Sequence, residues 1–412
     1  MNKLKIRNFG PIQGGYSVDD EFLAFPRLTV FCGPQGSGKS SVAKLYSALV
    51  WMEKTIYRYW LEAKDRGDKI FFLNALKWQG IDTYLRPTTE IEYIGEYALL
   101  AYRDGAFTAE VKSVQSSYRP RQIMYIPAER NLASIIRKAN SVQGLPGPLE
   151  NMQVAFQEAK EALGVGYKLP ANGYSFQYDR ARDESWIVNG DSGEKTRLEF
   201  ASSGLQSIVP LLLVSDYLEG KVLSDDKLTE RTVVSARDEL MCREVLKGAK
   251  AELATGKIDD LTYSTVLKHL YEPNHGLVSV IEEPEQNLYP ETQCDVVNKL
   301  LALANSASSN QIVISTHSPY VVNDIVTAQM AAEILAQSNS PETKRSVDEV
   351  YPVESAMSQS DMALYELSEK GIITLLETEG GVFSDTNMLN AVLGRWNDSF
   401  DRLLEIEARL NG

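Results

Sequence analysis

The segment 33–41 constrains this chain more than any other, because it reads Gly-Pro-Gln-Gly-Ser-Gly-Lys-Ser-Ser. Its spacing is that of a phosphate-binding loop: a glycine, four residues, then Gly, Lys and Ser or Thr. The apolar run Leu28–Cys32 precedes it, and the segment that begins at Ser41 has the apolar spacing of a helix. A buried strand, a glycine-rich loop and a helix in this order predict an α/β fold with an anion site at the helix N-terminus.

The residue types in this loop predict how a nucleotide would be held. Glycines let backbone N–H groups point at an anion, Lys39 can reach the β- and γ-phosphates, and Ser40 can ligate magnesium. We therefore expect ATP and Mg²⁺ as ligands, and a Gly-rich turn with a surface lysine is the alternative. The predicted nucleotide-binding residues are Gly33, Gly36, Ser37, Gly38, Lys39, Ser40 and Ser41.

Composition narrows the class of protein further. The chain has 412 residues, with 42 Lys plus Arg and 56 Asp plus Glu, which gives a formal charge of −14. An acidic chain argues against sequence-independent coating of DNA, but it leaves room for a local basic groove. Cys32, Cys242 and Cys294 are too few and too scattered for a disulfide framework or a zinc site. No signal peptide or bilayer-spanning stretch is evident, so we expect a cytoplasmic protein without a membrane partner.

A second motif ends the apolar strand predicted at 278–281. Two acids, Glu282 and Glu283, follow this strand, as a Walker B element requires. We expect Glu282 to hold magnesium and Glu283 to act as the catalytic residue that polarises the attacking water. The usual order is Asp then Glu, so a glutamate at the first position is a conservative departure. A solvated acidic loop is the alternative interpretation.

Two further segments complete the pattern. His317 follows the next apolar strand, where a histidine can hydrogen-bond a γ-phosphate and position water; a loop or core histidine is the alternative. Ser203 and Gly204 open an apolar helix, where small residues make another anion-binding N-terminus; a plain capped helix start is the alternative. We predict that His317 is catalytic, and both interpretations of Ser203 and Gly204 stay open at this point.

The order of these elements resembles that of ATP-binding-cassette ATPases: phosphate loop, serine-glycine helix start, strand with two acids, strand with histidine. Within that class the sequence is similar to the SMC, RecF and OLD heads rather than to transporter cassettes. This closer similarity rests on Asn-Phe-Gly at 8–10, Glu-Pro-Glu at 283–285 and Leu-Tyr-Pro at 288–290. The resemblance covers residues 1–50, 120–131, 196–215 and 276–325.

The resemblance implies a site shared between two subunits. In that family, the loop that Ser203 and Gly204 match contacts the γ-phosphate bound by the other subunit, so a head-to-head homodimer or higher oligomer would sandwich two ATP molecules. Asn287 and Leu288 match the loop that crosses this interface. The motif departs from the family at Leu205, where the family has glycine.

The family also has a glutamine that senses magnesium at the start of a helical lobe, and no residue here is assigned to it. The run 128–131, Ala-Glu-Arg-Asn, occupies a similar place in the chain. We expect Arg130 within this run to face the phosphates, with a surface ion pair as the alternative.

The remaining patterns predict an α/β fold of the ATP-binding-cassette type, with a mixed central sheet around the phosphate loop. Short β-rich runs around the turn at Asp104-Gly105 predict an antiparallel β subdomain, and charged stretches predict helical insertions. Residues 1–219 and 271–330 would form the two parts of the head. The segment 220–270 would be a helical insertion, and 331–412 a helical C-terminal cap.

The function that follows is an ATP-hydrolysing sensor or switch that works through ATP-dependent dimerisation. No segment can supply the long coiled coil of SMC proteins, and too few residues follow Asp385 for the Toprim domain of OLD nucleases. The chain thus resembles the ATPase components of bacterial anti-phage systems of the Septu, PARIS and retron-linked types. That resemblance implies a separately encoded effector nuclease as a partner.

Three other functions stay open. A RecF-like DNA-binding repair ATPase would need a basic surface, for which Arg119 and Arg121, with Arg137 and Lys138 nearby, are candidates; scattered solvated charges are the alternative. A small-molecule phosphotransferase would need a substrate pocket and normally lacks the element at Ser203. A transporter subunit fits least, because the segment after the two acids departs from that branch.

Overall fold

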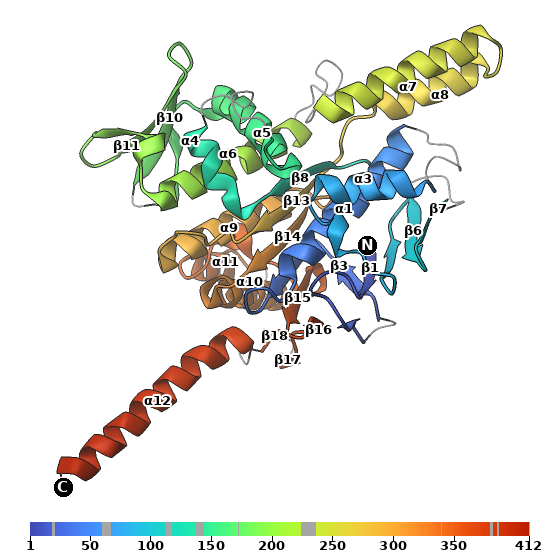
Figure 1. Ribbon diagram of the computed structural model, residues 1–412. Helices are drawn as coiled ribbons and strands as arrows, with labels where there is room; N and C mark the ends of the chain where they lie inside the picture. Colours follow the sequence, from blue (N-terminus) through green and yellow to red (C-terminus); the bar gives the residue numbers. More distant parts are fainter. Residues whose placement is uncertain are drawn as a thin grey trace.

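The computed structural model describes residues 1–18, 21–59, 67–112, 118–136, 144–171, 173–223, 236–338, 340–379, 382–384 and 387–411. Figure 1 shows a layered α/β body with two projections: the helix pair α7 (Ala236–Ala254) and α8 (Asp260–Tyr271), and the C-terminal helix α12 (Met388–Asn411). Among the helices of these residues, none has the length and apolar character that a membrane crossing demands.

A seven-stranded mixed sheet forms the middle layer. Its strands are, in spatial order, β2 (Gly15–Tyr16), β16 (Ile372–Leu375), β15 (Met362–Leu367), β4 (Leu28–Cys32), β14 (Gln311–Thr316), β13 (Leu277–Glu282) and β8 (Gln122–Ile126). The strands from β15 to β8 are parallel, and β16 is antiparallel to β15. All residues of β4, β13 and β14 are buried, as a parallel sheet covered on both faces requires.

One face of this sheet is covered by α1 (Lys39–Arg58) and by a five-stranded antiparallel sheet. The strands of that second sheet are, in spatial order, β3 (Leu23–Phe25), β1 (Asn2–Arg7), β5 (Glu90–Ile94), β6 (Ala98–Arg103) and β7 (Ala106–Val111). Side chains alternate between the two faces of a strand, so Phe31 and Val313 join this layer while Val30 and Ile312 join the other. Helix α3 (Lys69–Trp78) packs against α1 and β7.

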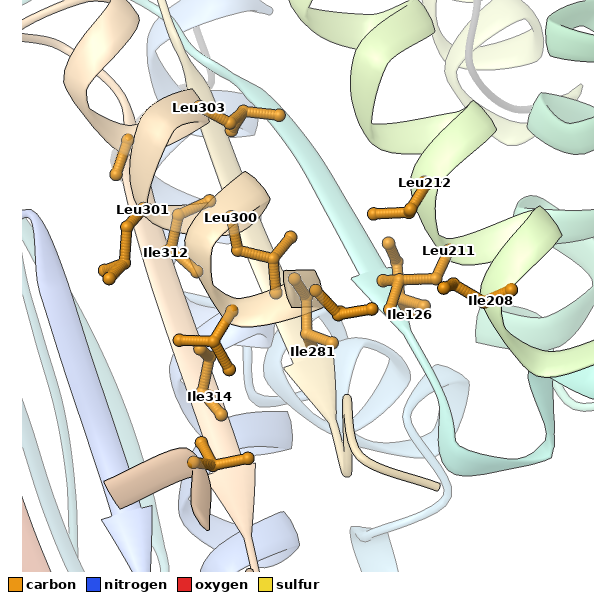
Figure 2. Close-up of a cluster of buried hydrophobic side chains, with 14 of the residues drawn as sticks. Ile126, Ile208, Leu211, Leu212, Ile281, Leu300, Leu301, Leu303, Ile312 and Ile314 are labelled. Atoms are coloured by element: carbon orange, nitrogen blue, oxygen red, sulfur yellow. The ribbon is translucent and has the colours of Figure 1, made fainter. Parts of the chain in front are cut away.

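Helices α5 (Gly147–Leu163), α6 (Ser203–Leu223), α9 (Pro290–Ser306) and α10 (Pro319–Gln337) bury the opposite face. Figure 2 shows isoleucines of the sheet, among them Ile126, Ile281 and Ile314, facing apolar side chains of α6 and α9. Beyond α5 and α6 lies a four-stranded antiparallel sheet in the order β12 (Lys195–Arg197), β11 (Glu184–Asn189), β10 (Tyr174–Asp179) and β9 (Tyr167–Lys168). This packing fixes α6, and with it the helix start at Ser203, against the central sheet.

The predicted fold class is confirmed, since a mixed sheet surrounds the glycine loop and carries antiparallel β-sheets and helices. The expectation of a purely helical segment 331–412 is wrong in its middle, because Met362–Leu367 forms β15 and pairs in parallel with β4. Residues 198–200 form a 3₁₀ turn ahead of α6. The division into head, insertion and cap stays a prediction. Residues 224–235 of the predicted helical insertion lie outside the described residues.

Candidate active site

Four loops of the predicted site meet at one edge of the central sheet, where the parallel strands β4, β14, β13 and β8 end. The glycine loop follows β4, His317 follows β14, Glu283 follows β13, and the 3₁₀ turn Ala128–Asn131 follows β8. Because β14 lies between β4 and β13, the sheet order puts His317 between the glycine loop and the acidic pair. This edge is where ligands of parallel α/β sheets gather.

Backbone geometry explains the glycines of the loop. Gly33, Gly36 and Gly38 have φ angles of 140°, 75° and 103°, which residues with a Cβ rarely adopt. A Cβ on Gly33 would lie 2.3 Å from the carbonyl oxygen of Leu367, and one on Gly38 would lie 2.5 Å from Cδ1 of Ile12. The loop is thus fixed between β15 and the N-terminal turn. Helix α1 begins directly after it, and no side chain caps its first N–H groups.

Lys39 is buried beneath this loop, with 4% of its surface exposed. Its Nζ donates hydrogen bonds to the carbonyl oxygens of Gly33 at 2.9 Å and Pro34 at 2.8 Å, and lies 3.4 Å from Nδ1 of His317. Burial lowers the pKa of Lys39 to about 8, against the opposing effect of the Glu283 carboxylate. Lys39 is therefore mostly protonated at neutral pH. It adds a positive charge to a helix N-terminus that already favours anions.

Glu282 has the burial and the unpaired oxygen of a metal ligand. It is 4% exposed, and its Oε2 accepts the backbone N–H of Ala128 at 3.3 Å. Its Oε1 is buried and has no hydrogen-bond partner among the described residues, and the same holds for the hydroxyl of Ser37. A buried carboxylate oxygen in this state is costly unless a cation or a donor binds it. The unpartnered Oε1 of Glu282 fits a metal ligand, so Glu282 and the predicted ligand Ser40 are the residues that would hold Mg²⁺.

Glu283 and His317 face each other across the ends of β13 and β14. Nε2 of His317 lies 3.5 Å from Oε1 of Glu283, and both side chains are partly exposed. Burial, and then the charge of Lys39, lower the pKa of His317. Its imidazole is therefore neutral at neutral pH, and the contact with Glu283 is not an ion pair. Glu283 has a φ of 43°, a left-handed conformation that residues other than glycine adopt mainly at functional or tightly constrained positions.

Glu285 is a site residue that the sequence alone did not identify. Its Oε1 accepts the hydroxyl of Thr316 at 2.7 Å and the backbone N–H of His317 at 2.8 Å. Burial raises the pKa of Glu285, and these hydrogen bonds oppose the rise. Glu285 ties the loop after β13 to the loop after β14, and so holds His317 opposite Glu283. The available signal was a third acid in the run Glu-Glu-Pro-Glu at 282–285.

The expectation for Arg130 is wrong in both of its forms. Its side chain is fully buried, so it is not a surface ion pair, and its guanidinium donates to backbone carbonyls rather than standing free for a phosphate. Nη1 donates to Glu282 O at 2.7 Å, Nη2 to Glu283 O at 2.6 Å and Nε to Ser207 O at 3.2 Å. Burial lowers the pKa of Arg130 to about 10, which leaves it charged at neutral pH. Arg130 thus links the acidic loop to the first turns of α6.

Substituting Arg130 by methionine should lower the free energy of unfolding by about 3 kcal/mol, because buried carbonyl oxygens lose their charged donors. Denaturant unfolding of the variant beside the unmodified chain measures this loss. Arg119→Met, at an exposed arginine, is the matched control and should change stability by less than about 0.5 kcal/mol. Equal stability of the two variants would show that the carbonyl network around Arg130 contributes nothing.

The helix start at Ser203 and Gly204 contacts the loop that follows β13. A Cβ on Gly204 would lie 2.7 Å from the carbonyl oxygen of Asn287, and Nδ2 of Asn287 donates to the hydroxyl of Ser207 at 3.3 Å. Ser203 and Asn287 are both exposed. The fold thus brings together, at the surface, the two segments that were predicted to take part in a dimer interface, 203–204 and 287–288. Nucleotide binding by Ser203 and Gly204 stays a prediction.

The candidate basic surface retains little support. Arg121 is largely buried, and its Nη2 lies 3.6 Å from Oε1 of Glu96. Arg119 is exposed, while Arg137 and Lys138 lie outside the described residues. One exposed arginine does not provide the row of phosphate contacts that duplex binding needs.

Comparison with known proteins identifies a similar family for one segment. Residues 264–322 match the family model described as AAA ATPase domain. This segment contains β13, the acidic pair, β14 and His317, and so one half of the candidate site. A search of curated proteins found no significant match to the chain.

Solved structures that align with this chain include ATPase heads and cassettes. The SMC head domain from Thermotoga maritima aligns over 92% of this chain and 98% of that chain, with 12% identity and a TM-score of 0.36. The Smc head domain from Pyrococcus furiosus, solved with an extended coiled coil and bound to the C-terminal domain of ScpA, aligns over 99% of this chain and 100% of that chain, with 11% identity and a TM-score of 0.37. A dimeric ATP-binding cassette bound to ADP and Pi aligns over 92% and 100%, with 11% identity and a TM-score of 0.30.

These structural similarities are too distant to carry an argument about ligands or assembly. The strand order, the glycine loop with its buried lysine and the family match are independent of them. On those three observations, the chain has the fold of a P-loop nucleotide-binding protein, and its residues 264–322 are similar to the AAA ATPase domain family.

Proposed function

We propose that this chain is an ATP-hydrolysing switch whose nucleotide sites are each completed by a second copy. The proposal rests on one observation: the predicted site residues form two groups. In the first group, at one edge of the sheet, Lys39 contacts His317 and His317 contacts Glu283. In the second group, the exposed helix start at Ser203 packs against Asn287. Backbone N–H donors at such an exposed helix start are available to a γ-phosphate bound by another copy.

Within one copy the residues have distinct roles. Lys39 and the first N–H groups of α1 bind the β- and γ-phosphates, while Ser40 and Glu282 hold Mg²⁺, which neutralises charge on the phosphate oxygens. Glu283 accepts a proton from the attacking water as that water displaces ADP from the γ-phosphate. The neutral imidazole of His317 hydrogen-bonds the γ-phosphate and so orients it toward the water.

The same contacts make assembly depend on the nucleotide. A γ-phosphate bound by Lys39 of one copy and by the 203–204 N–H groups of the other stabilises the dimer over the separate heads. Hydrolysis and release of phosphate remove this shared ligand and weaken the dimer. The equilibrium shifts only by the difference in ATP affinity between dimer and monomer, so dimerisation reports the bound nucleotide.

Mixed subunits test whether the site is shared. Lys39→Ala removes the cation of the glycine loop, and Ser203→Glu puts a carboxylate where the other copy's γ-phosphate would bind. Each variant alone should have less than about 1% of the unmodified ATPase rate. In an equal mixture, half of the dimers contain one of each variant and keep one intact site of two, so the rate should recover to about a quarter.

A second mixture controls for this result. Lys39→Ala and Glu283→Gln damage the same half of the site, so their mixed dimers have no intact site and should stay inactive. If the Lys39→Ala and Ser203→Glu mixture also stays inactive, the shared site is wrong. If Ser203→Glu alone keeps full activity, the helix start at 203–204 does not bind nucleotide.

We further propose that the switch controls a separately encoded effector nuclease in anti-phage defence. This step rests on the resemblance to the ATPase components of the Septu, PARIS and retron-linked systems. A tagged Glu283→Gln chain purified with ATP should carry the product of a neighbouring gene, and Lys39→Ala should carry less of it. Purification of both variants without any such product would contradict the effector role.

A further inference from the structure

The C-terminal helix α12 carries apolar side chains with heptad spacing. They recur at alternating steps of four and three residues. The positions are Leu389, Leu393, Trp396, Phe400, Leu403 and Leu410, with Glu407 at the one remaining step. We call these seven positions the α12 seam. A repeat of 3.5 residues is the spacing at which one helix keeps the same face against another helix along its length.

The α12 seam is exposed in a single copy from Leu393 onward, while Leu389 packs against the core of the body. Every residue from Leu393 to Leu410 is exposed, and Figure 1 shows the helix leaving the body. The exposed fraction is 69% for Trp396, 62% for Phe400 and 81% for Leu410. The first turn is held to the body, where Met388 N donates to a carboxylate oxygen of Glu366 at 2.7 Å. An apolar stripe of this length on a projecting helix marks an interaction surface.

We propose that a second copy of this chain covers the seam, by packing of α12 against α12. The charge pattern identifies this partner. The positions that flank the seam carry no charge: Asn390, Val392, Asn397, Ser399, Leu404 and Ile406. The charged residues lie on the outer face instead: Arg395, Asp398, Asp401, Arg402, Glu405 and Arg409. Charges at flanking positions select an unlike partner or repel a like one, so their absence leaves identical helices free to pair.

The exposed area is sufficient for such a pair. Seven apolar residues of the seam and its flanks, from Leu393 to Leu410, are between 40% and 81% exposed. At about 100–200 Å² for a large apolar side chain, they expose roughly 400–800 Å² per copy. Two copies would bury roughly 800–1,600 Å², which overlaps the range of about 1,200–2,000 Å² of specific interfaces. Leu404 and Ile406, which are counted among these seven residues, widen the apolar face.

This contact is distinct from the nucleotide-dependent one, because no residue of the glycine loop or of 203–204 takes part in it. We expect it to form without ATP. If the ATP-dependent dimer of the proposed function also forms, α12 pairing holds two heads together while their sites are empty and raises their effective concentration for closure. The pairing itself does not rest on the proposed function.

Sedimentation equilibrium of the full chain without nucleotide tests the pairing. It is measured in the Lys39→Ala background, where the ATP-dependent contact should be absent. The double substitution Trp396→Glu and Phe400→Glu should raise the dissociation constant at least about 100-fold, because it puts charges in the centre of the seam. Ala408→Glu on the outer face is the matched control and should stay within about twofold. Glu407→Leu should lower the constant at least about tenfold, because it replaces paired like charges by an apolar contact.

Three results would overturn the proposal. A chain that is monomeric without nucleotide leaves no self-association to explain. An association unchanged by the double substitution uses another surface. The third result would come from another site for α12. A cavity of about 480 Å³ lies between α10 and α11 (Pro341–Asp348), and Met330 and Ile334 are among the residues that line it. If Met330→Glu dissociates the assembly as strongly as the double substitution, α12 docks into this cavity and does not pair with a second α12.

Discussion

Replacing Glu283 by glutamine is expected to slow ATP turnover about 1,000-fold while ATP binding persists, because an amide cannot accept the proton of the attacking water. The substitution keeps the size of the side chain and its position 3.5 Å from His317. ATP should therefore hold the variant in the dimer that, in the proposed function, hydrolysis dissociates. Phosphate release measures the first effect, and the native mass with and without ATP measures the second.

Glu291→Gln is the matched control for this experiment. Glu291 is an exposed acid in the first turn of α9, and the same loss of charge there should leave turnover within about twofold. If the Glu283→Gln variant turns over ATP at the unmodified rate, Glu283 is not the catalytic residue. A Glu283→Gln variant that binds ATP and stays monomeric would instead contradict ATP-dependent dimerisation, without contradicting the catalytic role of Glu283.

Replacing Lys39 by alanine should weaken ATP binding at least about 100-fold and abolish ATP-driven dimerisation, because a buried cation no longer meets the phosphates. The loss extends beyond the missing charge. The ammonium of Lys39 also binds the carbonyl oxygens of Gly33 and Pro34, so its removal leaves those acceptors without their donor and loosens the loop. Titration calorimetry with ATP and Mg²⁺ measures the affinity, and the native mass with ATP measures the dimerisation.

Lys44→Ala, on the same helix α1, is the matched control and should bind ATP normally. Circular dichroism of both variants establishes that the head stays folded. Assembly that responds normally to ATP in folded Lys39→Ala would contradict the account of the site. Loss of binding in both variants to the same extent would point to damage of α1 as a whole and not to the role of Lys39.

Local patterns in the sequence predicted the parts of the site that depend on near neighbours in the chain. A glycine-rich loop between an apolar strand and a helix is encoded within about 20 residues, and the glycine φ angles leave few alternatives for its shape. The acids after β13 and the histidine after β14 were likewise predicted from strand ends. Parallel strands end at one edge, so adjacency of these three loops followed from the expected fold.

Local sequence patterns do not predict contacts between segments that lie far apart in the chain. The sequence pattern does not predict β15 as a strand, because a short apolar run buried on both faces has no strand-like alternation. The burial of Arg130 depends on α6, some 77 residues away in the chain, which supplies a carbonyl acceptor. Glu285 was an acid without an assigned role until the fold brought Thr316 and His317 to its carboxylate.

By itself, the sequence predicted a phosphate-binding loop between β4 and α1, and it determined which acids and histidine end the neighbouring strands. These features come from backbone conformation and from strand patterns, which short segments encode. Only the tertiary structure decided the order of the strands around that loop, the neutral state of His317 beside Lys39, and the placement of Ser203 against Asn287. Those properties depend on burial and on contacts between distant segments, and they exist only once the sheet has assembled.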